Sequence, residues 1–396
     1  MSPSDAASEP VALTGLEGVD YLGWLPEEWS EWARSVGEPA YRGRQIFEWL
    51  HRHLAAEPAA MSSLPESLRA RLSEAGVAWP WRLSVESKSD DGTRKLLLEP
   101  QSGDPKARIE TVLLPEQLVN FEDDPYTGGL RKESDAVSQC ISSQVGCAMG
   151  CVFCASGALG LTRHLSAGEI VAQTSLGRAQ LEAPQHLRRL VYMGMGEPLH
   201  NYEQTARSIR VLTHPWGFAL GARRITISTS GLVPKIDALA QDFAGHVHLA
   251  VSLHAADNET RTKILPINQR YPLEQLYACL KRYPLRRRRW ITIEYTLIEG
   301  INDGLADARA LSRWLRGLCV KVNLIPLNPV DHVPLKAPSP ARVLAFQRQL
   351  MDAGYSVYVR KQRGDDIDAA CGQLALRAAP ARTVRPAAQN RRLALL

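Results

Sequence analysis

Three closely spaced cysteines constrain this chain more than any other feature of its sequence. Cys147, Cys151 and Cys154 stand in the pattern C-x3-C-x2-C within residues 146–154. Three thiolates suit a soft metal centre, but a structural zinc site takes four ligands, and no further Cys or His follows at a suitable spacing. The pattern therefore favours an iron–sulfur cluster in which one iron has no protein ligand. Three buried structural thiols are the alternative, which is disfavoured because cysteine is too rare to cluster this tightly by chance.

The composition is typical of a globular protein of two or three domains, with 396 residues, 45% hydrophobic and 22% charged. No apolar stretch reaches the roughly 18 residues that span a bilayer. Residues 1–20 lack the pattern of a signal peptide, so we expect a cytoplasmic protein with no membrane partner. Seven cysteines in a chain this long do not indicate a disulfide framework. A net charge of +5 is too small to identify a nucleic-acid-binding protein.

Changes in composition along the chain predict five parts. They are a disordered leader (1–20), a helical accessory domain (21–80), a β linker and loop (81–136), the core (137–375) and a flexible basic tail (376–396). In the helical part, Leu64, Leu68 and Leu72 recur at helical spacing. In the linker, Asp91-Gly92 predicts a hairpin turn, and residues 115–136 are expected to form a polar loop.

Strand-like and helix-like segments alternate through the core, which predicts βα units and a parallel sheet. Strands are expected at 139–145, 188–194, 223–229, 246–252, 290–298 and 319–325. Helices are expected at about 166–182, 202–213, 233–243, 273–282 and 303–316. Ser166 and Glu169 form a capping box at the start of the first helix. We expect an α/β fold with a partial (β/α)6 barrel, a lateral opening, and chemistry at the C-terminal ends of its strands.

Small or polar residues follow the ends of four predicted strands. They are Gly194, Gly196 and Glu197 after one strand, Ser228 and Ser230 after the next, Ser252, Leu253 and His254 after the third, and Asn328 after the last. The glycines let a ligand approach the backbone closely, and Glu197 could bind a ligand ammonium group. Each group alone is equally well explained by a structural turn. Together they predict one ligand site that faces the cysteine motif.

Two further cysteines and one carboxylate are candidates for chemistry. Cys371 lies beside Gly372 after a polar acidic stretch, a context that suits an accessible, reactive thiol. Cys140 lies seven residues before the cysteine motif. The remaining pair, Cys279 and Cys319, are expected to be small buried hydrophobic residues. Glu110 is a lone carboxylate in a predicted strand, and its simplest interpretation is an outward-facing side chain.

Arginines are concentrated in two places. Arg286 to Arg289 form a row immediately before a predicted strand, which makes them the strongest local candidates for phosphate contacts, with a solvated turn as the nearly equal alternative. Five more lie in the predicted helical domain: Arg42, Arg44, Arg52, Arg69 and Arg71. These indicate either a solvated face or an RNA-contacting domain.

Several motifs together resemble those of a known family. The cysteine motif followed by Gly-Glu-Pro resembles the radical S-adenosylmethionine (SAM) superfamily. More narrowly, residues 143–147, 194–198, 252–255 and 363–372 resemble the RlmN/Cfr family of adenine-C2 or adenine-C8 RNA methyltransferases. The resemblance covers about residues 40–375, and the helical domain resembles the accessory RNA-binding domain of that family.

The resemblance implies a role for each candidate residue. Cys147, Cys151 and Cys154 would hold a [4Fe-4S] cluster whose open iron binds SAM. The SAM site would be lined by Gly196, Glu197, Ser228, Ser252, Leu253, His254 and Asn328. Cys371 would carry the methyl group as S-methylcysteine, Cys140 would be its partner thiol, and Glu110 would match the proposed proton acceptor of the family.

The resemblance also implies an activity, which is methylation of adenine C2 in the peptidyl-transferase region of 23S rRNA and, as a further substrate, in a tRNA anticodon loop. Because this carbon is not nucleophilic, one SAM would methylate Cys371 and a second, cleaved at the cluster, would activate that methyl group for addition to the ring. Attack by Cys140 would then release the RNA and leave a Cys140–Cys371 disulfide. A monomer and an electron donor such as flavodoxin are expected.

Two alternatives stay open. One is an adenine-C8 rRNA methyltransferase that confers antibiotic resistance. The other is an RNA-binding protein whose cluster is structural or senses redox state, and such a protein would need neither Cys140 nor Cys371. The loop at 115–136, the row Arg286–Arg289 and the basic tail depart from the family pattern, and the two basic segments would add phosphate contacts, which position RNA without specifying sequence.

Overall fold

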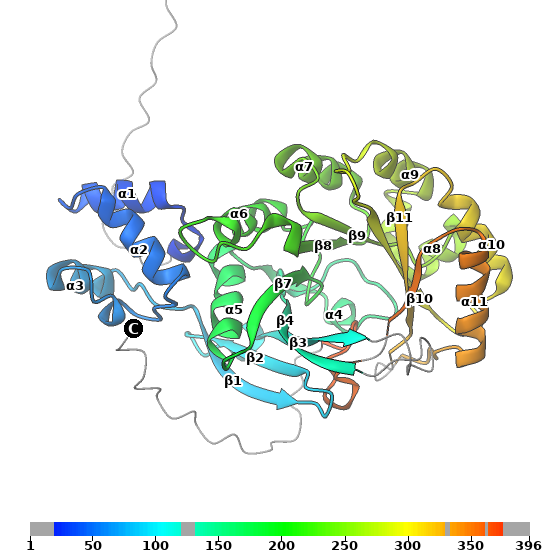
Figure 1. Cartoon of the computed structure of the whole chain (residues 1–396), viewed down its shortest axis with the longest axis horizontal. Coiled ribbons are helices and arrows are strands. Elements are labelled where there is room, and N and C mark those ends of the chain that lie inside the picture. Colours follow the sequence, from blue (N-terminus) through cyan, green and yellow to red (C-terminus); the bar gives the residue numbers. More distant parts are fainter. Residues whose placement is uncertain (1–19, 120–130, 329–332, 361–362, 375–396) are drawn as a thin grey trace, which may run out of the picture.

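The computed structural model describes residues 20–119, 131–328, 333–360 and 363–374 (Figure 1). The predicted leader lies outside these residues except for Asp20, and the predicted tail lies outside them entirely. A sheet of ten strands forms the centre, in the order β1-β2-β3-β4-β7-β8-β9-β10-β11-β12. The helices that alternate with the later strands cover the outside of this curved sheet (Figure 1).

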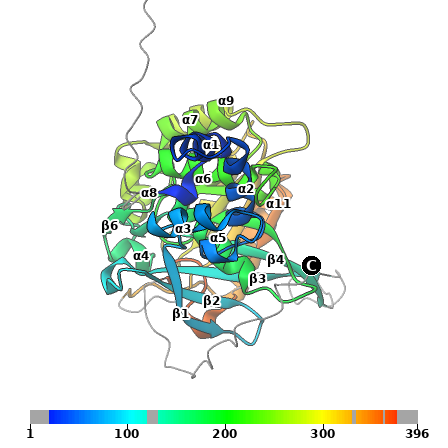
Figure 2. The ribbon, with the colours of Figure 1, turned by 90° about the vertical axis from the view of Figure 1, so that its left-hand side faces the viewer.

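The N-terminal part is helical, as predicted, and consists of α1 (Pro26–Ser35), α2 (Tyr41–His51) and α3 (Glu66–Glu74). Ile46, Phe47 and Leu50 are buried on α2, and Leu68 and Leu72 are buried on α3, so each helix buries the face that its hydrophobic spacing indicates. In Figure 2 these helices lie in front of α5 (Ala167–Ala179) and α6 (Tyr202–Thr213) of the barrel. The N-terminal part contacts both, because Gly168 N on α5 donates a 2.9 Å hydrogen bond to Asp20 Oδ1 and Arg207 on α6 forms an ion pair with Glu28 on α1.

The segment expected as a linker is part of the main sheet. β1 (Trp81–Lys88) and β2 (Arg94–Pro100) form the predicted hairpin around Asp91-Gly92, and β3 (Ile109–Val119) pairs antiparallel with both β2 and β4 (Arg131–Cys140).

The predicted loop at 115–136 is therefore strand at both ends, and residues 120–130 lie outside the described part of the chain. Its polar composition was misleading because strand pairing satisfies the backbone, while Glu116 and Asp135 keep partly or fully exposed side chains.

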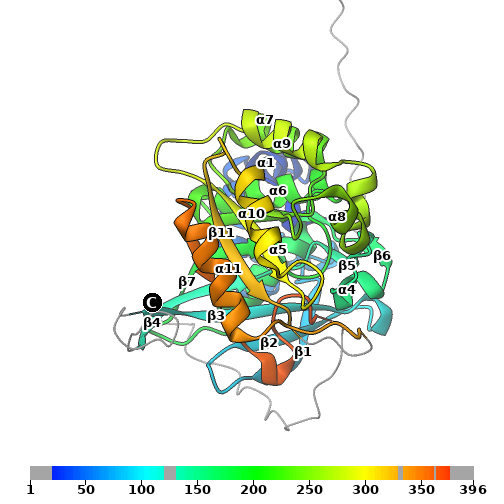
Figure 3. The same ribbon diagram turned by 90° about the vertical axis from the view of Figure 1, so that its right-hand side faces the viewer.

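The barrel consists of parallel strands, and helices on the outside connect each of them to the next. After β4 come β7 (His186–Tyr192), β8 (Ile225–Thr229), β9 (His248–Ser252), β10 (Ile291–Leu297), β11 (Val320–Pro326) and the short β12 (Val357–Val359). The helices are α5, α6, α7 (Val233–Phe243), α8 (Asn258–Ile264), α9 (Leu273–Arg282), α10 (Leu305–Trp314) and α11 (Pro340–Asp352). Figure 3 shows α10 and α11 covering the side of the barrel opposite the N-terminal helices. The predicted partial (β/α)6 barrel is confirmed.

The first predicted strand was placed wrongly. β4 ends at Cys140, and β5 (Gln144–Gly146) pairs with β6 (Leu161–His164) in a separate two-stranded sheet. The polar capping box was identified correctly, because Ser166 Oγ accepts a hydrogen bond from Glu169 N and the Glu169 carboxylate accepts one from Ser166 N. Helix α8 was not anticipated, since seven mostly polar residues are too few to display a hydrophobic period.

The two faces of the barrel strands differ in burial. Outward-facing residues such as Ile227, Val251 and Ile293 are fully buried beneath the helices. Inward-facing residues such as Ser228 and Ser252 are only partly buried. The inside of the barrel is therefore accessible rather than filled. Among the described helices, none is both long and apolar enough to cross a membrane.

Because His51 on α2 is buried against the barrel residue Phe218, we expect the folded protein to lose stability in acid. The His51 ring is fully buried, with its centroid 4.5 Å from that of Phe47 and 5.7 Å from that of Phe218, and burial together with nearby His214 lowers its pKa to about 3. His51 therefore binds a proton below about pH 6.5 in the unfolded chain, but only below about pH 3 in the folded chain. Stability should fall as the pH drops through this window, by up to about 1.4 kcal/mol per pH unit from this group.

The measurement is denaturant unfolding of the parent protein and of His51→Leu at pH 7.5 and pH 5. The variant should lose less stability between the two pH values. An equal loss in both proteins would contradict the assignment.

Candidate active site

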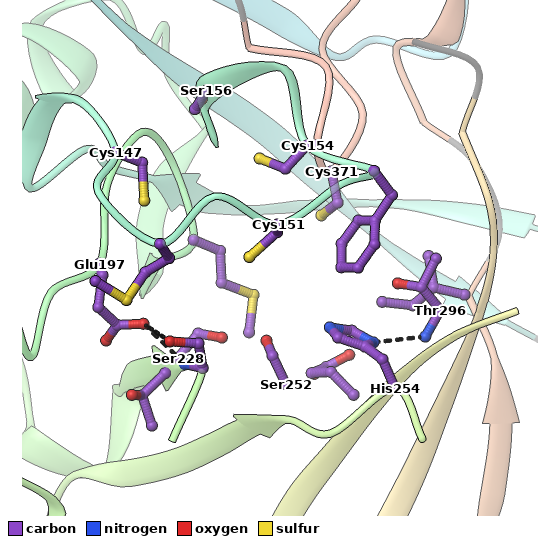
Figure 4. Close-up of a pocket in the computed structure, with 18 of the residues that line it drawn as sticks. Cys147, Cys151, Cys154, Ser156, Glu197, Ser228, Ser252, His254, Thr296 and Cys371 are labelled. Carbon is purple, nitrogen blue, oxygen red and sulfur yellow. Dashed lines mark hydrogen bonds between the residues drawn. The ribbon is translucent and has the colours of Figure 1, made fainter. Parts of the chain in front are cut away.

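The C-terminal ends of the barrel strands surround a cavity of about 160 Å³, here called the cluster cavity. It is lined by residues of the strand ends and by the cysteines of the motif, and these residues include Glu197, Ser228, Ser230, Ser252, His254, Thr296, Asn328, Cys147, Cys151, Cys154 and Cys371. Figure 4 shows the labelled cysteines above Glu197, Ser228, Ser252 and His254. The predicted strand-end residues thus converge on one site that faces the cysteine motif.

The cysteine motif lies on a loop between two short elements. Cys147 follows β5, and α4 (Ala155–Ala158) begins directly after Cys154. Cys147 N donates a hydrogen bond of 2.9 Å to Gly160 O, which closes the loop. Gly146 makes this closure possible, because its φ is +74° and a Cβ there would lie 1.8 Å from Gly160 O.

The three thiols fit an iron–sulfur cluster better than a single metal ion. All three line the cluster cavity, yet within the described residues no three Cys, His, Asp or Glu side chains lie close enough to hold one ion. A cluster requires wider spacing, since each thiolate binds a different iron. Burial raises the pKa of Cys147 to about 12 and raises those of Cys151 and Cys154 as well, so all three need a metal to become thiolates.

The same loop is joined to the segment that carries Cys371. Ala155 N donates a 2.7 Å hydrogen bond to Gly372 O, and Ser156 Oγ donates one of 2.7 Å to Leu374 O. Cys371 follows a short 3-10 turn (Asp365–Ile367) and is partly exposed, which agrees with the accessible thiol expected from the sequence.

Glu197 is a buried carboxylate held in a fixed orientation. Ser230 donates from its backbone N (2.8 Å) and its Oγ (2.9 Å) to Glu197 Oε2, and Leu199 N donates to Oε1 at 3.1 Å. Burial nevertheless raises the pKa of Glu197. A ligand ammonium group would restore its charged form, as predicted for this position.

His254 is also buried, and its ring orientation is fixed. Its Nδ1 accepts a 2.8 Å hydrogen bond from Thr296 N, so Nε2 carries the proton in the neutral ring, and burial lowers the pKa to about 3. The imidazole therefore stays neutral and can donate a hydrogen bond to a ligand. Neighbouring Leu253, also predicted to line the site, is fully buried and is not among the residues that line the cavity.

Asn328 connects the barrel to the Cys371 segment. Its Nδ2 donates a 2.8 Å hydrogen bond to Cys371 O, and its buried Oδ1 has no hydrogen-bond partner among the described residues. An unpaired buried acceptor is costly. A bound ligand with a hydroxyl or amine donor would satisfy it.

Cys140 and Cys371 line a second, smaller cavity together with Arg360, and Cys371 and Arg360 also line the cluster cavity. The two cysteines predicted as partners are therefore brought together. Burial raises the pKa of Cys140 to about 12, and the guanidinium of Arg360 opposes this shift. Both thiols are free in the structure.

Glu110 corrects the expectation of an outward-facing side chain. It is fully buried on β3, and its Oε1 lies 3.3 Å from Lys95 Nζ. Lys95 Nζ in turn donates a 3.3 Å hydrogen bond to Asp368 O, in the segment that precedes Cys371. The alternating strand pattern did not reveal that both faces of β3 are covered. Glu110 is not among the residues that line either cavity.

Cys319 is a second correction, because it is exposed, whereas Cys279 is buried as expected. Its position just before β11, at the open end of the barrel, explains the exposure.

Two arginines near the site gave no signal in the sequence. Arg261 on α8 is fully buried and donates to Leu253 O (3.1 Å), Ser230 O (2.7 Å) and Asn268 Oδ1 (2.8 Å). Burial lowers its pKa to about 10, and it fastens the ends of β8 and β9. Arg360 is the other, and it borders both cavities.

Comparisons with known proteins agree with this geometry. Residues 141–311 match the model of the radical SAM superfamily, and residues 19–77 match that of the ribosomal RNA large subunit methyltransferase N-terminal domain. The chain is 52% identical over 369 residues to the dual-specificity RNA methyltransferase RlmN of Sorangium cellulosum, covering 89% of this chain and 94% of that protein. It is 41% identical to the RlmN of Geotalea uraniireducens, over 91% and 97% of the two chains.

A solved structure is also similar. The crystal structure of a radical SAM methyltransferase from Sphaerobacter thermophilus superposes with a TM-score of 0.81 at 44% identity, covering 90% of this chain and 99% of that one.

The cluster assignment predicts that Cys151→Ser will lose most of its bound iron after anaerobic reconstitution with iron and sulfide, because one of three ligands is gone. Iron content and the broad visible absorption of the cluster are the measurements. Cys319→Ser is the matched control, since its thiol is exposed and outside the cavity. Full iron content in Cys151→Ser would contradict the assignment.

Proposed function

This chain belongs to the RlmN family of dual-specificity RNA methyltransferases, and we propose that it methylates C2 of an adenine in 23S rRNA and in a tRNA anticodon loop. The observation that supports this most directly is that Cys140 and Cys371 line one cavity and that Cys371 also faces the cysteine motif. A structural or redox-sensing cluster would not require this arrangement.

The family uses a [4Fe-4S] cluster and SAM. We assign the cluster to Cys147, Cys151 and Cys154, and SAM to the surrounding strand ends. Glu197 would bind the SAM ammonium group. His254 Nε2 and Asn328 Oδ1 supply a donor and an acceptor, and Gly196, Ser228 and Ser252 complete the wall, with Leu253 between two lining residues. Cluster and SAM together would supply an electrophilic methyl group and one-electron hydrogen abstraction.

Cys371 and Cys140 would carry out the transfer of the methyl group and the release of the RNA. Cys371 would accept the methyl group on its sulfur and, after hydrogen abstraction, bond through that carbon to adenine C2, which holds the RNA covalently. Once the adduct has lost its ring proton and one electron, which the oxidised cluster would take back, the Cys140 sulfur would attack the Cys371 sulfur and break its bond to the transferred carbon. That carbon would keep the bonding electrons and take up a proton to become the methyl group, leaving a Cys140–Cys371 disulfide that requires reduction.

The adduct must also lose the ring proton, and Glu110 and Cys140 are the two candidate acceptors. Cys140 lines the cavity, whereas Glu110 is paired with Lys95 on β3. This favours Cys140 as the group that acts directly on the adduct, with Glu110 acting through intervening groups.

The same proposal assigns a role to each part of the chain, an oligomeric state and a location. Residues 21–80 would be the accessory RNA-binding domain, 81–136 strands that extend the barrel, and 137–375 the catalytic core. The enzyme would work as a monomer in the cytoplasm with an electron donor such as flavodoxin.

Cysteine variants test the mechanism. Cys371→Ala should abolish RNA methylation and the transfer of labelled methyl from SAM to the protein, because the acceptor sulfur is missing. Cys140→Ala should keep protein labelling and accumulate a covalent protein–RNA adduct, because release is blocked. Label is measured by scintillation counting and the adduct by denaturing gel, with Cys319→Ser as control. Normal methylation by Cys371→Ala would overturn the mechanism.

Mass spectrometry of nucleosides from the treated RNA then separates the candidate products. The 2-methyladenosine isomer supports the proposal, and 8-methyladenosine would replace it with the C8 alternative.

A further inference from the structure

The barrel holds another, larger cavity at the opposite ends of its strands. This basal cavity has a volume of about 630 Å³ and lies among the N-terminal ends of β7 to β11. Its cationic lining residues are Arg189, Arg223, Arg224, Arg288, Arg289, Lys321, Arg360 and Arg363. Nothing in the mechanism above uses it.

The basal cavity carries more positive than negative charge, although Arg363 is paired with Asp91, with Nε and Oδ2 3.6 Å apart. Only two of its lining residues are acidic, Glu116 and Glu294. Glu116 is already paired, since its carboxylate lies 3.1 Å from Arg189 and 3.4 Å from Arg188. Arg223, Arg224, Arg288 and Arg289 form no ion pair with any carboxylate in the part of the chain that the structure describes. Bringing like charges together without anions is unfavourable, so a cavity of this kind is suited to an anionic ligand.

The basal cavity adjoins the cluster cavity. Met193, Glu294 and Arg360 line both. Inward-facing residues of one strand line both cavities in turn. On β9, His248 and Ala250 line the basal cavity, and Ser252 lines the cluster cavity. The inside of the barrel therefore links the cationic end to the reactive end.

The lip of the basal cavity carries an exposed aromatic ring. Trp290 has 43% of its surface exposed and directly follows Arg288 and Arg289, and Lys321 Nζ lies 5.7 Å from the ring centroid. An exposed aromatic ring beside unpaired arginines is typical of single-stranded nucleic-acid sites, where the ring stacks on a base and the cations contact phosphates.

The N-terminal domain offers fewer free cations. Arg44 pairs with Glu48 at 2.9 Å and its guanidinium lies 4.4 Å from the Trp216 ring centroid. Arg42 donates to Gln45, and Arg71 donates to Val36 O. Arg42, Arg44 and Arg71 thus have partners within the protein, whereas Arg223, Arg224, Arg288 and Arg289 of the basal cavity pair with no carboxylate among the described residues.

We propose that the basal cavity binds the phosphates that flank the target adenine in single-stranded RNA, and that the flipped-out adenine reaches Cys371 through the inside of the barrel. This inference rests on the proposed function. Unpairing a loop nucleotide costs little compared with a duplex base. The arginines would hold the backbone at one end, while the base passes Met193 and Glu294 to the cluster cavity.

The salt dependence of RNA binding tests this proposal. The probe is a hairpin RNA with an adenine-containing loop, titrated against the reconstituted holoenzyme at several salt concentrations. Arg288→Gln/Arg289→Gln should lower the slope of log Kd against log salt by about 1.4, because each lost contact with a single strand removes about 0.7. The control is Arg309→Gln/Arg313→Gln, which removes the same charge from exposed positions on α10.

An unchanged slope in the basal variant, or an equal change in the control, would overturn the proposal. Binding of tripolyphosphate that the basal variant abolishes, without displacement of the hairpin RNA, would also overturn it and assign the cavity to a small anion.

Photocrosslinking provides a measurement that needs no variant. A hairpin with 4-thiouridine next to the target adenine should crosslink to the peptide that contains Trp290, as mapped by mass spectrometry. Crosslinks confined to residues 21–80 would contradict the proposal. The two proposals can fail separately. If the proposed function is wrong, the parent protein will not methylate RNA, whereas the salt dependence of Kd and the crosslinks report RNA binding alone.

Discussion

Two hydrogen bonds hold together the parts of the chain on which the chemistry depends. They run from Ala155 N to Gly372 O and from Ser156 Oγ to Leu374 O, and the second spans 218 positions of sequence. They fix the cysteine loop to the segment of Cys371, so that the proposed cluster and the proposed methyl carrier keep one relative position. Orientation of reactants is one of the largest contributions that a protein can make to a rate. Asn328, through its bond to Cys371 O, adds a third attachment from the barrel itself.

The antiparallel strands β1 to β3 belong to the same arrangement. Through β3 and β4 they extend the barrel sheet, so β4 is paired on both sides and Cys140 at its end is held beside the Cys371 segment. Glu110 on β3 and Lys95 on β2 lie behind that segment, and Lys95 reaches Asp368 O. What the sequence presented as a linker is thus a supporting wall of the active site.

The sequence revealed those features that depend on local pattern. Alternating hydrophobic segments gave the barrel, and polar residues after strand ends gave the cluster cavity, because parallel strands bring their C-terminal ends together. Features that depend on distant packing were missed. Nothing in the neighbourhood of Glu110 or Cys319 showed that the first would be covered on both faces and the second exposed. Arg261 was invisible for the same reason, since its partners are backbone carbonyls of two other strands.

The open inside of the barrel has a consequence for how the protein tolerates mutation. A complete barrel fills its centre with side chains and draws stability from both faces of each strand. Here only the outward face is packed, through residues such as Ile227, Val251 and Ile293, while the inward face lines cavities. Alternate positions along one strand therefore have different roles: outward residues pack against the helices, and inward residues line the cavities. Substitutions at outward positions would chiefly reduce the amount of folded protein, and those at inward positions would leave a folded protein with altered chemistry. Where the lining residues are only partly buried, as at Ser228 and Ser252, a change removes less packing than at an outward position and so has less effect on the fold.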